Sequence, residues 1–267
     1  EIKINEFLSF EGFVDMSYSH TDTDGDNAPL NGSENSFSID QVEIDWLFNF
    51  GKVTGQIDLQ HENNADGQET GVEQAFVSYD LGNGSALTMG RYESMLGLEA
   101  KEPTGLYQYS TAYEGLSFLP QYGQGVRYTG QSGDISYGVS LQDESFDNGG
   151  SNLGGADDND GSYSIEAAVS LTSGNFTYSL GGAFEDADED GDNSIINAHV
   201  VYVSGAWTFG AEYNHADIES NTTFADGTPL SSNETEVDSW LVMANYAYSD
   251  CCSVTGRVSS VDYKDAD

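Results

Sequence analysis

Apolar and polar residues alternate along the first apolar stretch of the chain, residues 8–18. Even positions such as Leu8, Phe10 and Val14 are mostly apolar. Odd positions such as Glu11 and Asp15 are mostly polar. Because neighbouring side chains of a strand point to opposite faces, this period of two predicts a β-strand with two chemically different faces.

The same alternation recurs to the end of the chain. Further stretches that show it are residues 42–50, 53–59, 75–81, 135–141, 163–171, 176–184, 196–202, 207–213, 240–248 and 254–258. Helical spacing appears nowhere over a comparable length. The pattern predicts about thirteen strands, most of them near the roughly 9 to 11 residues that cross a bilayer obliquely.

The connections between these stretches alternate between short and long. The short ones carry turn residues and lie near residues 51–52, 82–84, 131–134, 173–175, 204–205 and 249–250. The long ones are polar and acidic, at residues 20–36, 61–71, 93–121, 143–161, 186–194 and 216–236. This regularity predicts an all-β fold, a transmembrane up-and-down antiparallel β-barrel that forms a single domain over residues 1–267. A large soluble antiparallel β protein remains the alternative.

The chain is strongly acidic, with 7 Lys and Arg against 46 Asp and Glu and a net charge of −39. This charge argues against a nucleic-acid partner, because phosphates require basic patches. It favours solubility in salt, attraction of cations, or both. Disorder is the usual alternative for such a charge, but the alternation and the 12% aromatic content argue for a folded chain with acidic loops.

The two faces of the strands differ in a way that predicts their surroundings. Aromatic residues such as Trp46, Tyr79 and Trp207 gather near the strand ends on the apolar faces, as in the interfacial girdles of membrane barrels. A mid-strand carboxylate facing lipid would cost on the order of 1 to 3 kcal/mol. The acids must therefore face inward around a wet lumen, and the predicted pore-lining set includes Glu11, Asp15, Glu43 and Asp45.

Closure of the barrel is a separate expectation. Residues 258–267 resemble the start of another outer loop rather than a closing strand. Bacterial single-chain barrels have even strand numbers, and about sixteen strands leave an aqueous channel. We expect 14 to 16 strands or more in the complete barrel, with closing strands that follow residue 267.

The third long connection, residues 93–121, is less acidic and more apolar than the others. Leu106, Tyr113, Phe118 and Leu119 belong to it, and so much apolar surface should be packed rather than solvated. We expect this loop to fold into the lumen. A packed external cap and a contact between protomers are the alternatives.

The few arginines suggest a constriction. Arg127 and Arg257 occupy polar-face positions, whereas Arg91 is ambiguous because Gly90 could mark a bulge. The hypothesis is that these arginines line one wall and face loop carboxylates, namely Glu93, Glu99 and Glu102, which would impose a transverse field on solutes. The alternative is that each arginine neutralises nearby inward acids.

Metal and catalytic motifs are weak. Asp186, Asp188, Asp190 and Asp192 match the first half of a calcium loop, but Asn197 stands where a bidentate Glu is needed. Solvated acidic loops are the favoured interpretation, with calcium on the outer loops as the minority one. The four histidines lack metal-ligand spacing and no catalytic constellation stands out, so neither a cofactor nor an enzymatic activity is predicted.

The adjacent Cys251 and Cys252 are expected in or beside a turn, with a vicinal disulfide as an alternative.

The N-terminal part of the chain is similar to a known family. Residues 73–79 (EQAFVSY), the turn at 82–84 and residues 87–92 (LTMGRY), together with residues 7–18, resemble the OmpL-like family of outer-membrane β-barrel porins. The resemblance implies a porin of the bacterial outer membrane, embedded in lipid, through which small hydrophilic solutes and ions diffuse passively without a cofactor. By analogy with general porins it also implies a third loop that narrows the pore and a homo-oligomer, with a trimer as the favoured state.

Three functions follow as hypotheses. The favoured one is a channel for small hydrophilic solutes that prefers cations because of its acidic lumen. The second is a structural or surface-interaction protein of the outer membrane whose acidic loops bind calcium. An outer-membrane enzyme is the third and is disfavoured. Glu1 is expected to begin a chain from which a signal peptide has been removed.

Overall fold

The fold is a single antiparallel sheet of fourteen strands, in which each strand is hydrogen-bonded to its neighbours in sequence. The computed structural model describes residues 1–23, 32–64, 67–113, 116, 118–146, 163–186, 192–220 and 233–265. The strands are β1 (Ile2–Lys3), β2 (Leu8–Thr23), β3 (Gly32–Asn49), β4 (Val53–Asn64), β5 (Gly67–Gly82), β6 (Ser85–Glu93), β7 (Tyr122–Ser132), β8 (Ile135–Gln142), β9 (Tyr163–Ser173), β10 (Phe176–Asp186), β11 (Asp192–Ser204), β12 (Trp207–Ser220), β13 (Asn233–Ser249) and β14 (Cys252–Asp265). The predicted all-β, up-and-down arrangement is confirmed. The thirteen expected strands are β2 to β14, and the two-residue β1 is the addition.

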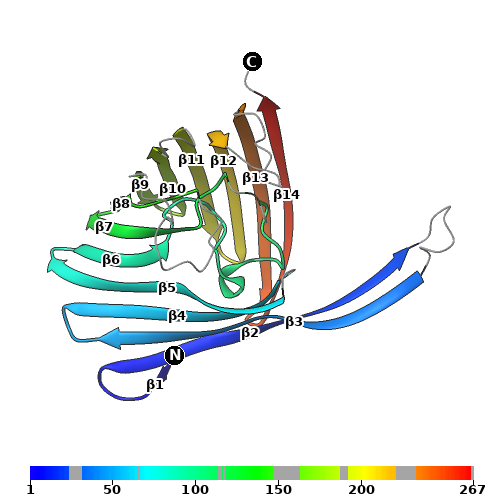
Figure 1. Cartoon of the computed structure of the whole chain (residues 1–267), viewed down its shortest axis with the longest axis horizontal. Coiled ribbons are helices and arrows are strands. Elements are labelled where there is room, and N and C mark those ends of the chain that lie inside the picture. The colour runs from blue at the N-terminus through cyan, green and yellow to red at the C-terminus, as the bar shows by residue number, and fades with distance from the viewer. Residues whose placement is uncertain are drawn as a thin grey trace.

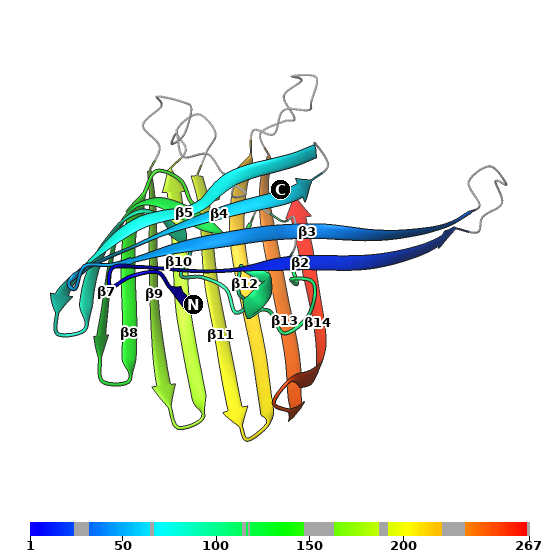
Figure 2. The same ribbon diagram turned by 90° about the horizontal axis from the view of Figure 1, so that it is seen from below.

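Tight hairpins join alternate strand pairs at the positions that the turn residues predict. At the turn between β5 and β6, Asn83 (φ 57°) and Gly84 (φ 75°) both have left-handed backbones. Two such residues are what a hairpin turn compatible with strand twist requires. Figure 2 shows these hairpins at one end of the sheet.

Several strands are longer than the hydrophobic pattern predicts. The expected long connection at residues 61–71 is mostly strand, because β4 runs to Asn64 and β5 begins at Gly67. Similarly, β14 continues to Asp265, where an outer loop was expected from residue 258 onward. Backbone pairing thus continues beyond the regular alternation of apolar residues, as the pairing of β4 with β5 and of β13 with β14 shows.

The two faces of the sheet have opposite chemistry. Large apolar side chains such as Leu180 (54% exposed) and Val242 (48% exposed) cover the convex face. Carboxylates at alternate positions, such as Glu166 and Glu212, are buried on the concave face. The predicted division between apolar and acid-bearing faces is therefore present along the strands.

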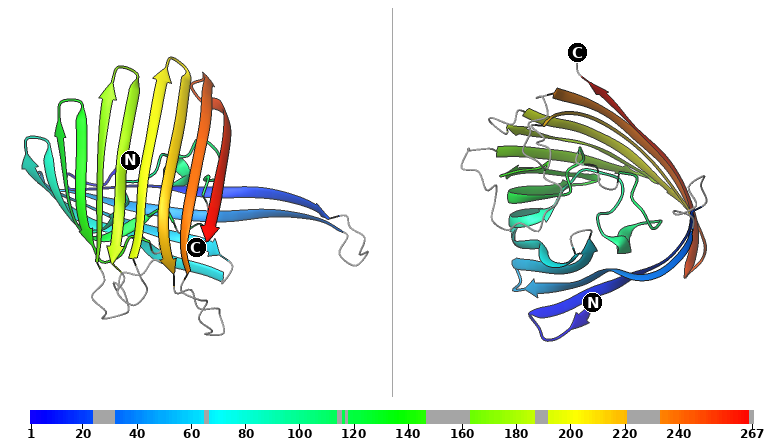
Figure 3. Two further views of the ribbon diagram at one scale, coloured as in Figure 1. Left: turned by 90° about the horizontal axis from the view of Figure 1, so that it is seen from above. Right: turned by 45° about the vertical axis from the view of Figure 1, so that its right-hand side comes forward.

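The sheet curls around the connection between β6 and β7, which Figure 3 shows in green inside the curve. In Figure 1 the far ends of β2 and β3 project away from the rest of the sheet, and β1 and β14 are its two end strands. The connection between β6 and β7, residues 94–121, contains the 3₁₀ turn η2 (Pro103–Gly105). In the part of the chain that the structure describes, no helix is long and apolar enough to cross a membrane.

Candidate functional site: an acidic cavity beside the third loop

The third loop, defined here as residues 94–121, is fixed to the concave face by hydrogen bonds to buried acids. Ser94 donates its hydroxyl, and Met95 its backbone N–H, to the two oxygens of Glu166 on β9, at 2.6 and 2.7 Å. Leu98 donates its N–H to Glu212 on β12 at 2.8 Å. These two buried carboxylates therefore act as loop anchors.

Apolar side chains of the loop pack on an apolar part of the concave wall. The cluster consists of Leu96, Tyr113, Phe118 and Leu119 from the loop, with Phe146, Ala183, Ile195, Ala216, Val237, Leu241 and Met243 around them. The expectation that the loop folds inward is confirmed. The inward-facing acids share the concave face with an apolar region, because these strands present small and apolar residues where the loop lies.

Arg257 on β14 holds the far side of the loop. Its Nη1 lies 2.8 Å from Glu99 Oε1, and its Nη2 donates to the Thr111 carbonyl at 3.1 Å. Both members of the ion pair are largely buried. Arg257 and Glu99 are thus in direct contact rather than opposed across an opening.

Arg127 on β7 is also enclosed. Its Nη2 donates to the Glu93 carbonyl and lies 3.7 Å from Glu166 Oε1. Its guanidinium lies 3.9 Å from the centre of the Tyr92 ring, within cation–π distance. Arg127 therefore contacts the wall of the sheet and the base of the loop.

Arg91 on β6 is buried, at 7% exposed. Its Nε donates to the Glu73 carbonyl at 3.0 Å, and its guanidinium lies 5.3 Å from the Tyr122 ring. The suspected bulge at Gly90 is absent from this described part of the sheet, because Gly90 pairs with Phe76 without a register shift. Gly90 instead has φ 127°, and a Cβ there would lie 2.1 Å from the Ala75 carbonyl oxygen. The backbones of β5 and β6 therefore lie too close together at this position for any residue with a Cβ, which explains why it is a glycine.

A cavity of about 640 Å³ opens between the first strands and the loop. Seven acidic residues line it: Glu1, Glu11, Glu43, Asp45, Asp58, Glu93 and Glu102. Five of these belong to the site expected from the sequence. Asp58 was missing from that set, although its place in the alternation indicates an inward side chain. Asp15, half-buried on β2, and Glu99 do not line the cavity.

Carboxylates crowd together on one wall of this cavity. Glu43, Glu73 and Glu102 bring one oxygen each to within 4.8 Å of the others. Burial, followed by the neighbouring Glu73, raises the pKa of the loop residue Glu102 to about 9. Glu73 could not be identified from the pattern, because it is the extra residue of a bulge between the pairs Asp58–Gln74 and Leu59–Val72.

Lys101 brings a positive charge into the loop beside this wall. Its Nζ donates to the Pro120 carbonyl at 3.1 Å. Burial lowers the pKa of Lys101, while carboxylates that include Glu212 and Glu93 raise it. Lys101 is not among the residues that line the cavity, and these are predominantly acidic.

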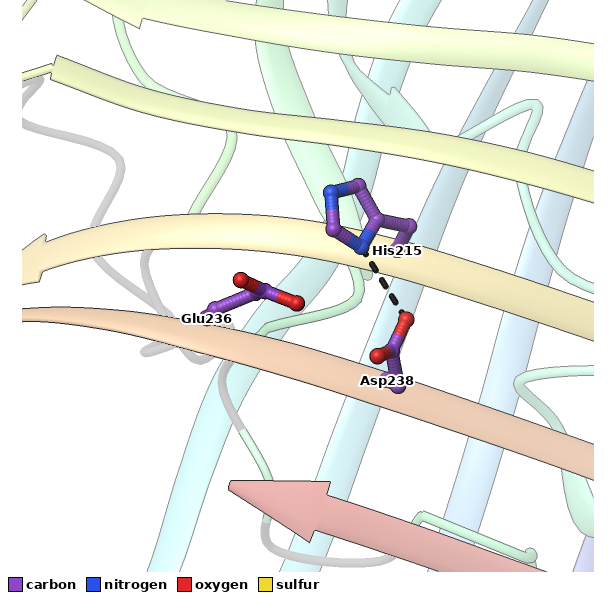
Figure 4. A group of neighbouring side chains, drawn as sticks. All are labelled: His215, Glu236 and Asp238. Atoms are coloured by element: carbon purple, nitrogen blue, oxygen red, sulfur yellow. Dashed lines mark hydrogen bonds and ion pairs between the residues drawn. The ribbon is translucent and has the colours of Figure 1, made fainter. Parts of the chain in front are cut away.

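A second acidic group lies on the convex face, near the long-loop ends of β12 to β14. Figure 4 shows His215, Glu236 and Asp238 together, with His215 Nδ1 3.0 Å from Asp238 Oδ1. Lys264 lies 2.9 Å from Glu236 and 2.5 Å from Asp238. The lysine supplies the charge that a metal would otherwise bring, so this is a surface ion-pair group.

The calcium-like motif is only partly described. Asp186 and Asp192 are paired across β10 and β11, whereas Asp188 and Asp190 lie outside the described residues. Calcium on this loop stays a prediction.

The two cysteines lie at the hairpin that joins β13 to β14. Both are exposed, and the Sγ atoms of Cys251 and Cys252 are 3.1 Å apart. Their position agrees with the expected turn.

Comparison with known proteins gives one family and a set of similar folds. The model of the family described as "Putative beta-barrel porin-2, OmpL-like" matches residues 8–266. No curated protein matches the sequence.

Solved structures with a similar fold include three outer-membrane proteins. The anion-selective porin of Comamonas acidovorans is 14% identical with a TM-score of 0.64, over 96% of this chain and 79% of that one. The outer membrane channel DcaP of Acinetobacter baumannii is 13% identical with a TM-score of 0.64, over the same shares. Salmonella typhi OmpF, in complex with daunomycin, is 14% identical with a TM-score of 0.63, over 97% of this chain and 79% of that one. At these identities the similarity concerns the fold.

Proposed function

Because the chain belongs to the OmpL-like β-barrel porin family, matched over residues 8–266, we propose that it forms a channel through which small hydrophilic solutes diffuse, with a preference for cations. The family and the fold are those of proteins of the bacterial outer membrane. Passive diffusion requires a pore and its charges but no chemical step, so we expect no enzymatic activity.

The convex face has the properties of a lipid-facing surface. Large apolar side chains stay exposed along the strands from β2 to β14. Aromatic rings lie in contact near the hairpin end, for example Trp207 and Tyr246 with ring centres 4.6 Å apart. Apolar bands flanked by aromatic girdles are typical of outer-membrane barrels.

The charge of the cavity supports the preference for cations. Seven acidic residues line it, while Arg127 and Arg257 form ion pairs with Glu166 and Glu99. A wall of one sign raises the local concentration of ions of the opposite sign. The fold does not decide the sign of selectivity, since one protein of similar fold is described as anion-selective. The acidic cavity is therefore the observation on which the proposal depends.

Reconstitution into planar bilayers tests this function. With a KCl gradient across the membrane, we expect discrete conductance steps and a reversal potential of the sign set by K⁺ permeation. A reversal potential of the opposite sign would contradict the cation preference. Preparations that insert but never conduct would favour a structural or surface-interaction role, with calcium on the acidic loops.

The oligomeric state is a separate proposal. By analogy with general porins we propose a homo-oligomer, with a trimer as the expected state. Light scattering of the detergent-solubilised protein, corrected for bound detergent, distinguishes a trimer from a monomer.

A further inference from the structure

Three carboxylates from three separate elements meet on the wall of the acidic cavity. Glu43 comes from β3, Glu73 from β5 and Glu102 from the third loop, just before η2. Their nearest oxygens all lie within 4.8 Å of one another. We propose that this carboxylate trio, Glu43, Glu73 and Glu102, binds a hard divalent cation, with Ca²⁺ as the best match.

Hydrogen-bond donors near the trio are too few to satisfy its oxygens. Tyr122 donates its hydroxyl to Glu73 Oε1 at 2.6 Å and lies 3.3 Å from Glu102 Oε1, but its single proton can serve only one of them. Gln41 donates to Glu43 Oε2 at 3.1 Å. Glu73 Oε2 and Glu102 Oε2 are buried without a hydrogen-bond partner. Buried carboxylate oxygens without donors are ligands available to a cation.

A neighbouring acid also has a buried carboxylate oxygen without a hydrogen-bond donor. Asp58 lines the same cavity, is only 1% exposed, and leaves its Oδ1 without a partner. Its other oxygen is satisfied by Gln56 and Gln74 at 2.9 and 2.7 Å. Asp45, paired with Asp58 across β3 and β4, also has a buried Oδ1 without a partner. Two further acids therefore raise the negative potential at the trio.

Several basic groups around the third loop are paired with acids outside the trio or with backbone carbonyls. The ion pairs of the described Arg and Lys side chains join Arg127 to Glu166, Arg257 to Glu99, and Lys264 to Glu236 and Asp238. Arg91 also lies beside the trio, since its Nε donates to the backbone carbonyl of Glu73. Like charges this close in a partly buried site are relieved either by a proton or by a counter-charge, and a bound cation would supply the counter-charge.

Local features of the backbone set the positions of Glu73 and Glu102. The bulge in β5 directs Glu73 to the same side of the sheet as its neighbour Gln74, which is buried on the cavity wall. Bulges commonly redirect a side chain at a functional site. Glu102, in turn, lies one residue before the rigid Pro103 of η2. The backbone positions of Glu73 and Glu102 are thus set by local structure.

The geometry and chemistry of the trio suit calcium. Ca²⁺ binds carboxylate and water oxygens at about 2.3 to 2.6 Å, so two of its ligands can lie up to about 5 Å apart. The oxygen separations of the trio, within 4.8 Å, fall inside this limit. The adjoining cavity, about 640 Å³ in volume, has room for the waters that would complete six to eight ligands. Mg²⁺ is less suitable, because it requires closer and more regular ligands.

Binding at this site would tie the third loop to the β3–β5 wall. The opposite side of the loop is already held by Arg257 and by the apolar cluster. Cation binding itself does not depend on conduction, so it can be measured whether or not the channel function is correct.

Terbium luminescence offers a direct test, since Tb³⁺ replaces Ca²⁺ and Tyr122 is placed to sensitise it. The full-length protein, purified in detergent and stripped with a chelator, should give saturable luminescence that Ca²⁺ competes away. Glu102→Gln and Glu43→Gln should each weaken binding at least about tenfold. Glu236→Gln is the matched control, because it removes one acid from the convex-face group and should leave the affinity unchanged.

Each possible result decides the question. Heat-dependent electrophoretic mobility establishes that every variant is folded, and if Glu102→Gln does not fold, Glu43→Gln carries the comparison. Equal binding by the wild type and both trio variants would mean that the ion lies on other acidic segments, which would overturn the proposal. The absence of saturable binding to the folded wild type would overturn it as well, since the trio would then be compensated by protons.

Discussion

Arg257 on β14 and Glu99 in the third loop are 158 residues apart in sequence, and Arg257 Nη1 lies 2.8 Å from Glu99 Oε1. The arginine also donates to the carbonyls of Ser110 and Thr111. One side chain thus connects a strand at one end of the sheet to both limbs of the loop. The position of the loop depends on this contact as well as on apolar packing.

Arg257→Met should therefore destabilise the protein strongly. The substitution leaves Glu99 largely buried without its partner, and removing one member of a buried pair costs about 3 to 5 kcal/mol. Urea titration in lipid vesicles, followed by the electrophoretic shift of the folded barrel, measures the loss. Adding Glu99→Gln should recover part of it. Lys264→Met, which breaks ion pairs at a more exposed lysine, should stay close to the wild type. Equal losses in the two single variants would contradict this role of Arg257.

The face of the sheet that meets lipid can be tested on adjacent residues of β10. Leu180 lies on the convex face, whereas Ser179 lies on the other face with its hydroxyl 2.8 Å from that of Ser170. Leu180→Arg should cost about 2 to 4 kcal/mol if it lies near the bilayer midplane, because an arginine there is exposed to hydrocarbon. Ser179→Arg should cost clearly less, since its side chain can reach water. Refolding into vesicles with urea titration gives both values, and the reverse order would mean that the faces are assigned wrongly.

Which face each strand buries could be predicted from the sequence because the pattern is local. Ser179 and Leu180 differ in polarity, and a period of two places them on opposite faces without knowledge of any partner. The turn at Asn83 and Gly84 is similarly encoded within a few residues. These local signals were sufficient for the sheet order, because successive strands of an up-and-down sheet pair with each other.

The contacts of the candidate site could not be predicted in the same way. Glu73 reaches the trio through a bulge, and one inserted residue leaves no mark in the polarity of β5. The anchoring of Met95 by Glu166 joins residues 71 positions apart and depends on how the loop crosses the sheet. The alternation therefore identified most of the acids that face inward but not which of them hold the loop.

Gly90→Ala should be poorly tolerated. Gly90 has φ 127°, and an added Cβ would lie 2.1 Å from the Ala75 carbonyl oxygen, so both backbone strain and a clash result. We expect a loss of at least about 1 to 3 kcal/mol, the usual cost of a strained backbone residue. Gly256→Ala on β14 is the control, because nothing lies within 4 Å of its added Cβ, and it should change stability by less than about 0.5 kcal/mol. Thermal unfolding of both variants in detergent distinguishes them, and equal midpoints would show that β5 and β6 can separate at this point.

Reversing a single charge inside the acidic cavity should weaken the preference for cations. Asp45 lines the cavity, whereas Glu34 is an exposed residue of the same strand outside the cavity lining. One wall charge about 4 Å from a permeant ion contributes about 1 kcal/mol in water, which corresponds to roughly a fivefold change in the ratio of K⁺ to Cl⁻ permeability. Asp45→Lys should therefore lower this ratio by a factor of that order or more, and Glu34→Lys should lower it much less.

The ratio follows from reversal potentials at low and high salt, and the difference between the variants should shrink at high salt as the charges are screened. If the two variants shift the ratio equally, net charge rather than the cavity governs selectivity. If neither variant shifts it, ions pass without coming close to Asp45, and the acidic cavity is not part of their path.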